Sequence, residues 1–253
     1  MGRAGRVGAG VGVVALLVAG LGACADAGED TEPERRSFGI EGQSLVIESD
    51  DSALEIVAAE GIPEGEVRVT RWFKGSVVMG GDPKVTWEME DGRLKLRMKC
   101  SGVVADCAAK HLIEVPRGIS VQVQEGDGSV RARGFEDALN IRTGDGSVHV
   151  TDSTGPLRVQ TGDGSVRAEV DSREVRAQTG DGSVKLELGV VPDLVESRTG
   201  DGSVTIEVPR ATYRVSTQTG DGGVDVSVPR DEASGHVIGA RTGDGKVTVR
   251  TAN

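Results

Sequence analysis

The sequence is poor in aromatic residues, which make up 2% of its 253 positions: three Phe, two Trp and one Tyr. Trp72, Phe73 and Trp87 lie close together in the first half of the chain, whereas the second half holds only Phe135 and Tyr213. Sugar-binding sites usually stack rings on aromatic side chains, so this composition argues against a carbohydrate site in the second half. Because aromatic side chains bury large apolar areas, we expect Trp72, Phe73 and Trp87 to fill one end of a core.

Signatures of catalysis are also missing. The sequence has no Gly-x-Ser-x-Gly elbow, no Walker loop and no dinucleotide-binding fingerprint. Its three histidines, His111, His149 and His236, are scattered without the spacing of metal ligands. His149 and Asp152 could be imagined as base and acid of a polysaccharide-acting enzyme, but two exposed polar residues at a strand end are the simpler interpretation. We therefore predict that the protein is not an enzyme and needs no cofactor.

A long apolar run occurs only at the start of the chain. Arg3 and Arg6 precede an apolar stretch from Val7 to Leu21, which small residues follow. This order is typical of a secretory signal and is too short for a comfortable membrane span. Leu21-Gly-Ala-Cys24 resembles the lipobox of bacterial lipoproteins, in which the cysteine is lipidated and becomes the first residue of the mature chain.

The lipobox implies a signal peptide over residues 1–23 and a lipidated Cys24. Residues 24–37 are polar and acidic, and we predict that they form a flexible tether. The mature protein would then be held by its lipid at the outer face of the cytoplasmic membrane. Ordinary cleavage after Ala25 is the alternative, because Ala23-Cys24-Ala25 also fits the small-x-small rule, and it would release a secreted protein.

Two further cysteines are present, Cys100 and Cys107. In an exported chain such a pair favours a disulfide, which would close a short loop and contribute about 2–3 kcal/mol. A metal-binding or redox pair is the alternative, but zinc would need a second pair of ligands.

Positive charge is under-represented, since 29 Lys and Arg face 40 Asp and Glu, a formal net charge of −11. Loss of Arg3 and Arg6 with the signal would make the mature chain more acidic still. Such an excess repels nucleic acid and anionic lipid headgroups. We therefore expect no nucleic-acid partner, and contact with the membrane only through the lipid anchor.

One hexapeptide, Thr-Gly-Asp-Gly-Ser-Val or a close variant, occurs seven times. Its copies begin at Glu125, Thr143, Thr161, Thr179, Thr199, Thr219 and Thr242. The first glycines are 18, 18, 18, 20, 20 and 23 residues apart. Asp-Gly favours a tight turn, and a step of about 20 residues with two strands and two turns is typical of a solenoid.

Apolar residues alternate with polar ones on both sides of each hexapeptide. They fall five and three positions before the first glycine, and four and six positions after it; Ser197 and Thr217 are the two exceptions. The intervening positions are mostly polar, as at Gln160 and Arg198. This period of two predicts two strands per coil, each with one face turned inward, so that each coil buries its apolar residues by stacking on the next.

We predict one all-β domain, a single-domain β-solenoid over residues 38–253. Residues 117–253 hold about seven regular coils of 18–23 residues, and residues 38–116 form a less regular N-terminal part. Within that part, residues 44–56 repeat the spacing of the later coils and indicate a diverged first coil. Residues 74–83 read as a glycine-rich loop, where a variable binding site could be placed without disturbing the scaffold.

Stacking would bring the hexapeptide aspartates into one column: Asp127, Asp145, Asp163, Asp181, Asp201, Asp221 and Asp244. At the strand spacing of about 4.8 Å, neighbouring charges repel by about 0.9 kcal/mol in water. Hydrogen bonds from the amides of each turn are the simplest compensation. Calcium binding is the alternative, although a single column of carboxylates offers fewer oxygens than calcium prefers.

The lipobox, the diverged β half, the cysteine pair before Glu114-Val-Pro116 and the Thr-Gly-Asp-Gly-Ser-Val coils together resemble the bacterial putative-adhesin family of unknown function. The resemblance covers Gly39 to Val249. It implies an exported or membrane-associated β-solenoid, and it supplies no catalytic residues.

The sequence thus predicts a non-catalytic lipoprotein of the cell envelope, with the solenoid as an adhesin-like or protein-interaction scaffold. Its partner would be an unidentified envelope protein or surface ligand. A calcium-binding envelope protein or an envelope-stress accessory protein is the alternative, and a polysaccharide-acting enzyme is less expected.

Overall fold

The computed structural model describes Ala27 and residues 30–252. The predicted signal peptide and Cys24 lie outside these residues. The described chain is built from β-strands, as predicted. It contains no helix of the length and apolarity that a membrane crossing requires.

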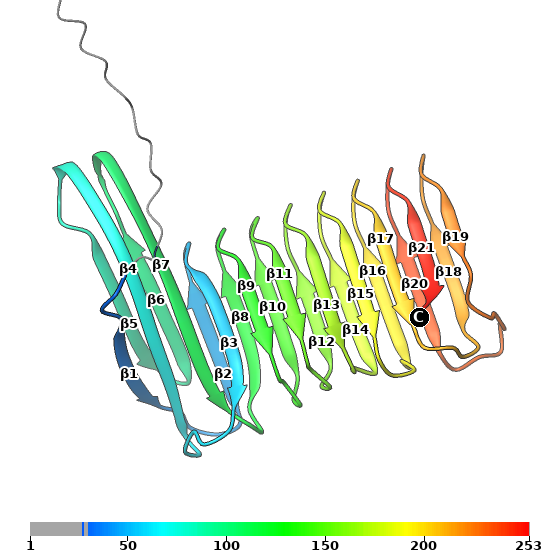
Figure 1. The fold of residues 1–253 in the computed structure, drawn as a ribbon, viewed down its shortest axis with the longest axis horizontal. Helices are drawn as coiled ribbons and strands as arrows, with labels where there is room; N and C mark the ends of the chain where they lie inside the picture. The colour runs from blue at the N-terminus through cyan, green and yellow to red at the C-terminus, as the bar shows by residue number, and fades with distance from the viewer. Residues whose placement is uncertain (1–26, 28–29, 253) are drawn as a thin grey trace, which may run out of the picture.

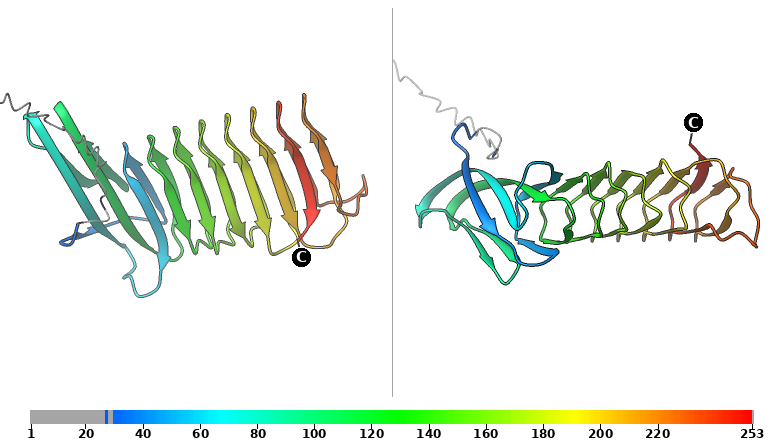
Figure 2. Two further views of the ribbon diagram at one scale, coloured as in Figure 1. Left: turned by 45° about the horizontal axis from the view of Figure 1, so that its top comes forward. Right: turned by 90° about the horizontal axis from the view of Figure 1, so that it is seen from below.

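Two sheets face each other across the core (Figure 1). In spatial order the 11-stranded first sheet contains β1 (Glu34–Gly39), β4 (Glu66–Gly80), β7 (Gly102–Pro116), β3 (Ala53–Ala59), β9 (Val130–Arg133), β11 (Val148–Thr151), β13 (Val166–Val170), β15 (Val184–Leu188), β17 (Val204–Val208), β21 (Val247–Thr251) and β19 (Val224–Val226). The 10-stranded second sheet contains β18 (Arg214–Gln218), β20 (Val237–Arg241), β16 (Leu194–Arg198), β14 (Glu174–Gln178), β12 (Leu157–Gln160), β10 (Leu139–Thr143), β8 (Ser120–Glu125), β2 (Ser44–Ser49), β6 (Arg93–Lys99) and β5 (Lys84–Glu90). Figure 2 shows the coils stacked along one long axis, with the N-terminal strands splayed at one end.

The regular coils stack as the hexapeptide spacing predicts. Each coil contributes one strand to each sheet, and strands of neighbouring coils pair in parallel with equivalent residues adjacent, such as Leu139 beside Leu157. Most inward-facing residues of these coils are fully buried. The polar exception Ser197 is buried with them, whereas Thr217 is only half-buried. The predicted β-solenoid is confirmed.

The diverged first coil is also confirmed, but it is not first in space. β2 pairs with β8, which places Leu45 beside Val121, and β3 pairs with β9, which places Leu54 beside Val130. On their other side, β2 pairs with β6 and β3 pairs with β7. The first coil is therefore held between two segments that follow it in the sequence.

The last coil is out of sequence order as well. β20 pairs with both β16 and β18, and β21 pairs with both β17 and β19. Figure 1 shows this coil, in red, between the yellow and orange coils that precede it in the chain. The prediction that every coil contacts the next one in the sequence is therefore wrong at this end.

The inward-facing residues explain why the β20–β21 coil lies inside the stack and the β18–β19 coil lies at its end. In the β20–β21 coil all four are apolar and fully buried: Ile238, Ala240, Val247 and Val249. The β18–β19 coil carries the polar Thr217 at one of the same positions, and its Val224 is 49% exposed. The more apolar coil lies inside the stack, where its side chains are covered on both sides, and the more polar coil forms the end.

The N-terminal part differs from the prediction at two segments. β1 begins at Glu34, inside the predicted tether 24–37, and pairs antiparallel with β4. It is an edge strand whose side chains are mostly exposed, so its composition resembles that of a tether. Residues 74–80, predicted to lie in a loop, instead continue β4, which pairs along its length with β7.

The predicted disulfide between Cys100 and Cys107 is present, and it ties the end of β6 to β7. Trp87 is buried as predicted, edge-on to Phe38 and 4.3 Å below the guanidinium of Arg71. Trp72 and Phe73 are only half-buried, so of the three clustered aromatics Trp87 alone fills the core.

The exchanged coils provide a matched test. Val247 and Val224 occupy the same place after their hexapeptides, but only Val247 is fully buried. Val247→Ala should lower the free energy of unfolding by about 2 kcal/mol, and Val224→Ala by less than about 0.5 kcal/mol. Denaturant unfolding of both variants measures the difference. A larger loss for Val224→Ala would mean that the coils follow sequence order.

Candidate ligand-binding face

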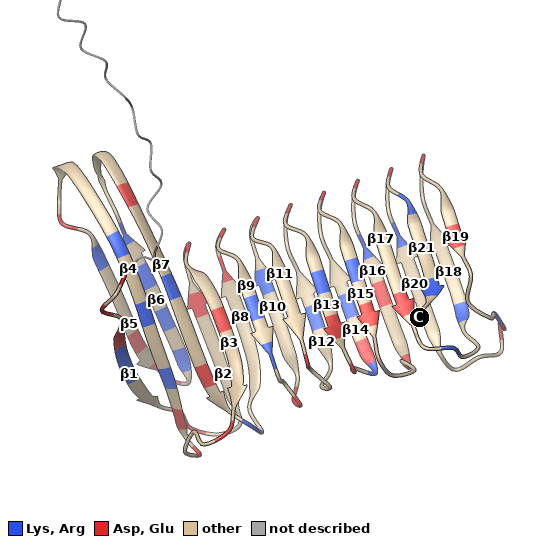
Figure 3. Cartoon of the chain, viewed as in Figure 1, with Lys and Arg blue, Asp and Glu red and all other residues tan. Residues whose placement is uncertain are grey.

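The Gly-Asp-Gly corners lie in a row along one edge of the stack, and Figure 3 marks their acidic residues in red at the ends of the coils. The seven predicted aspartates are all exposed: Asp127, Asp145, Asp163, Asp181, Asp201, Asp221 and Asp244. Their carboxylates form no hydrogen bond or ion pair with any described residue, so the predicted compensation by turn amides is not observed. No three His, Cys, Asp or Glu side chains in the described ranges are grouped to hold a metal ion.

Threonine and glycine, rather than aspartate, join neighbouring corners. The hydroxyl of Thr179 donates a bifurcated hydrogen bond to the carbonyls of Gly162 and Gly164 in the adjacent coil, at 2.9 and 2.8 Å. Five other corners repeat this arrangement, from Thr143, Thr161, Thr199, Thr219 and Thr242. The threonine of the hexapeptide is therefore a coil-to-coil contact.

The first hexapeptide has Glu125 where the others have threonine. Its carboxyl lies where a threonine hydroxyl lies in the later coils, against the corner of the diverged first coil at Ser49 and Ser52. Glu125 is 7% exposed, and neither carboxyl oxygen has a hydrogen-bond partner among the described residues. Burial raises its pKa to about 7, although the nearby Ser49 hydroxyl and the Gly128 amide oppose the shift.

The histidines do not form a catalytic group. His149 and Asp152 form no hydrogen bond or ion pair with each other in the described chain. His111 is buried in β7, where burial and then the charge of Arg71 lower its pKa to about 4. A neutral imidazole at this place is part of the core.

The outer surface of the second sheet carries a different kind of group. Alternation along β10, β12, β14, β16 and β20 turns five arginines outward, which we call the arginine face: Arg142, Arg158, Arg176, Arg198 and Arg241. Neutral amides stand between them: Gln122, Gln124, Asn140, Gln160, Gln178 and Gln218. Glu174 and Glu196 are the acids beside them, and both form ion pairs with Arg176.

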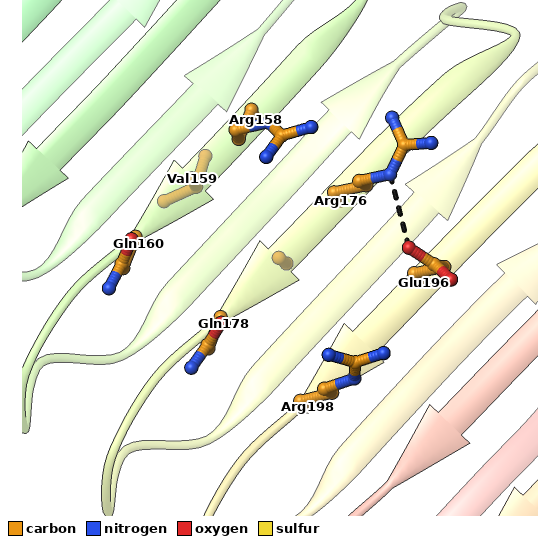
Figure 4. A pocket seen from close by; sticks show the side chains of 8 residues that line it. Arg158, Val159, Gln160, Arg176, Gln178, Glu196 and Arg198 are labelled. Carbon is orange, nitrogen blue, oxygen red and sulfur yellow. Dashed lines mark hydrogen bonds and ion pairs between the residues drawn. The ribbon is translucent and has the colours of Figure 1, made fainter.

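Like charges are adjacent on this face. The parallel register places Arg158 beside Arg176 and Arg198 beside Arg241. Arg142, Arg158, Arg198 and Arg241 form no ion pair with any residue that the structure describes. Figure 4 shows three of the arginines and two glutamines around a shallow hollow of about 200 Å³, where Arg176 reaches Glu196 at 3.1 Å.

The outer surface of the first sheet is largely compensated. Glu207 accepts from Arg250 at 2.8 Å and lies 3.7 Å from Lys185. Arg167 pairs with Glu169 on the same strand. Among the coil strands β9 to β21 of this sheet, Arg131 and Arg133 of β9 are the arginines without an ion pair to a described residue. The two faces of the stack therefore differ in charge although they arise from the same repeat.

The arginine face is suited to binding anions. Guanidinium groups stay charged at all ordinary pH values and bind carboxylate or phosphate through paired N–H donors, and glutamine adds neutral donors beside them. The face was not identified from the sequence, because the net charge of −11 conceals a local excess of the opposite sign. The available signal was the set of positions two and four before each first glycine, which hold five arginines and one glutamate.

The raised pKa of Glu125 has a consequence for stability. A carboxyl whose folded pKa, about 7, exceeds its ordinary 4.5 favours the folded state when protonated, and that contribution is lost as the pH rises through 7. The wild-type protein should therefore lose up to about 3 kcal/mol between pH 4.5 and 8 relative to Glu125→Gln, since one pKa unit corresponds to about 1.4 kcal/mol. Urea unfolding across this range measures the effect, and Glu125→Thr should remove it as well. An identical pH profile for wild type and Glu125→Gln would contradict it.

Comparison with known proteins agrees with this architecture. Residues 84–253 match the family model described as Toastrack DUF4097. No curated protein matches. A crystal structure of a putative adhesin from Parabacteroides merdae ATCC 43184 is similar over 88% of this chain and 97% of its own, with 12% identity and a TM-score of 0.50. A crystal structure of a putative adhesin from Bacteroides fragilis NCTC 9343 is similar over 88% of this chain and 98% of its own, with 11% identity and a TM-score of 0.49.

At 12% identity the Parabacteroides merdae structure supports the fold alone, whereas the family model spans about two thirds of the chain. The resemblance to the putative-adhesin family is confirmed, and the chain belongs to the Toastrack DUF4097 family.

Proposed function

We propose that the protein is a non-catalytic, adhesin-like scaffold of the cell envelope that binds an extended anionic polymer on its arginine face. We further propose that it is exported and held at the outer face of the cytoplasmic membrane by a lipid on Cys24. The observation that carries the binding proposal is the set of four arginines without ion pairs on one flat sheet: Arg142, Arg158, Arg198 and Arg241.

Electrostatics favour an anionic ligand. Adjacent guanidinium groups at the strand spacing of about 4.8 Å repel by about 0.9 kcal/mol in water. Arg158 beside Arg176, and Arg198 beside Arg241, are two such contacts. Glu174 and Glu196 both pair with Arg176 and compensate the first contact, but no described acid compensates the second. An anion lying across β16 and β20 would turn this repulsion into attraction.

Geometry favours an extended ligand over a small one. The arginines are spread over strands β10 to β20, around a shallow hollow rather than a deep pocket. A parallel sheet fixes their spacing before a ligand arrives, so little ordering entropy is lost on binding. The exposed aspartates along the corner edge would repel a polyanion, so it should lie on the sheet and avoid the corners.

The non-catalytic part of the proposal rests on the chemistry of this face. Arginine and glutamine side chains do not exchange protons near neutral pH, and they offer no nucleophile. They can hold an anion in place, which is the work expected of an adhesin-like scaffold.

Arginine substitutions provide the test. Arg198→Gln with Arg241→Gln should weaken the binding of the mature protein to polyphosphate or polygalacturonate about tenfold or more, and should reduce its salt dependence by about two counterions. The control is Arg131→Gln with Arg133→Gln, which removes the same charge from the other sheet and should change the affinity less than about twofold. Titration at several salt concentrations measures both.

Two results would overturn the binding proposal. One is the absence of saturable binding to either polymer. The other is an equal loss in the two double variants, which would mean that only the overall charge matters.

A further inference from the structure

The exposed large apolar side chains are concentrated at one place. Val78 and Met79 of β4 and Val103 and Val104 of β7 are 56–75% exposed. They lie together at the tip of the β4–β7 ribbon, where Val78 is paired with Val104. In a protein with so many polar surface residues, such a cluster indicates a contact with something apolar.

The tip projects beyond the rest of the stack. The first residue of β3, Ala53, pairs with Lys110, so residues 102–109 of β7 extend past the start of β3 and pair only with β4 in the described sheet. Eight residues of strand measure about 27 Å. Figure 1 shows β4 and β7 rising past the end of β3.

The ribbon is built to keep its form without a third strand. Two-stranded ribbons are weak by themselves, but the Cys100–Cys107 disulfide ties β7 to the end of β6. At the tip Val77 packs over Gly80 and Gly102, where an added Cβ would lie 2.6 and 2.3 Å from its Cγ1. These glycines are therefore explained by close packing.

Met79 has an unusual backbone conformation. Its φ of 51° is in the left-handed region, which glycine or asparagine normally occupies. The side chain is 75% exposed, so packing within this chain does not explain the choice of residue. Strain of this kind is more common where a side chain is presented for function.

Asp30, near the N-terminal end of the described residues, is bonded to this ribbon. The Phe73 amide donates a hydrogen bond to the Asp30 carboxylate at 3.0 Å. Cys24 is six residues before Asp30 in the sequence, and six residues of chain span at most about 20 Å. Met79 is six residues after Phe73 along β4, which is also about 20 Å. A lipid on Cys24 and the apolar tip can therefore reach the same plane.

We propose that the tip of the β4–β7 ribbon is a second membrane contact, inserting Val78, Met79, Val103 and Val104 shallowly into the bilayer that holds the lipid on Cys24. This inference rests on the proposed lipid anchor. It extends the sequence-based expectation of contact through the lipid alone. The part of the ribbon beyond β3 separates the hexapeptide corners from the headgroups, and exposed charges farther apart than a Debye length of about 8 Å are largely screened. Asp82, just after β4, is the exposed acid nearest the tip in sequence.

The position of a reporter tryptophan tests the contact. The lipidated full-length mature protein is reconstituted into vesicles of phosphatidylcholine and phosphatidylglycerol with brominated acyl chains. Met79→Trp should then show a blue-shifted emission, and its quenching should exceed by at least about twofold that of Glu64→Trp, once the emission of Trp72 and Trp87 is subtracted. Glu64 is an exposed residue just before the opposite end of β4, about 50 Å away, and serves as the matched control.

A second variant separates insertion from mere proximity. Val78→Asp with Val104→Asp, added to Met79→Trp, should return the quenching to the level of the control, while the melting temperature stays unchanged because both valines are exposed. Equal quenching at positions 79 and 64 would overturn the proposal. A blue shift of Met79→Trp that occurs without vesicles would also overturn it, because a second copy or a partner protein, and not lipid, would then cover the tip.

The anchor is tested separately by the mass of the N-terminal peptide. An unmodified Cys24 would overturn the lipid anchor, and the difference between the two tryptophans on added vesicles would still report on the tip. A lipidated Cys24 with no such difference would overturn the tip contact alone.

Discussion

Close contact between backbones at the glycine corners is the constraint on which the structure depends. A Cβ on Gly164 would lie 2.2 Å from the carbonyl oxygen of Gly146, and one on Gly182 would lie 2.2 Å from that of Gly164. No side chain fits there, so any other residue would push neighbouring coils apart. Because the corners meet at backbone distance, the strands on either side stay in hydrogen-bonded register, and the threonine hydroxyls reach two carbonyls of the next coil. The apolar core and the outer faces both follow from that register.

Register also decides how charge is distributed. With a period of two, residues at one offset from the glycine form a straight column on one face. On the first sheet, adjacent columns place Lys185 near Glu207, and the charges cancel. On the second sheet, columns of arginine and glutamine place Arg198 beside Arg241, and the charge remains. A chain that is acidic as a whole therefore presents one positively charged surface, which a count of charges over the whole sequence cannot reveal.

The sequence predicts the repeated part of this molecule well, because the turns, strands and buried faces there are determined by residues close together in the chain. Val148, Val166 and Val184 each follow a Gly-Asp-Gly turn at the same distance, so strand, face and neighbour are all determined within 20 residues. The order of coils at the ends is not local. It depends on which of two similar coils gains more by being covered on both sides, a comparison between residues such as Thr217 and Ala240. The arginine face was not predicted for a related reason, since its arginines come from separate coils and are brought together only by stacking.

At both ends of the stack the coils are out of sequence order, and this order protects the coils nearest the chain ends. A terminal coil has a neighbour on one side only, and a free chain end there frays easily. Here the coil nearest each terminus, residues 44–59 and residues 237–251, is held between two others. The outermost coils are internal segments of the chain, so both of their ends are covalently tied to the stack. At the N-terminal end, β6 and β7 are covered by antiparallel strands and by Trp87. At the other end, the β18–β19 coil is more polar, and the Tyr213 hydroxyl beside it donates a hydrogen bond to the Pro209 carbonyl. Both ends of the described stack are therefore covered by segments of this same chain, while the β4–β7 ribbon projects at the N-terminal end.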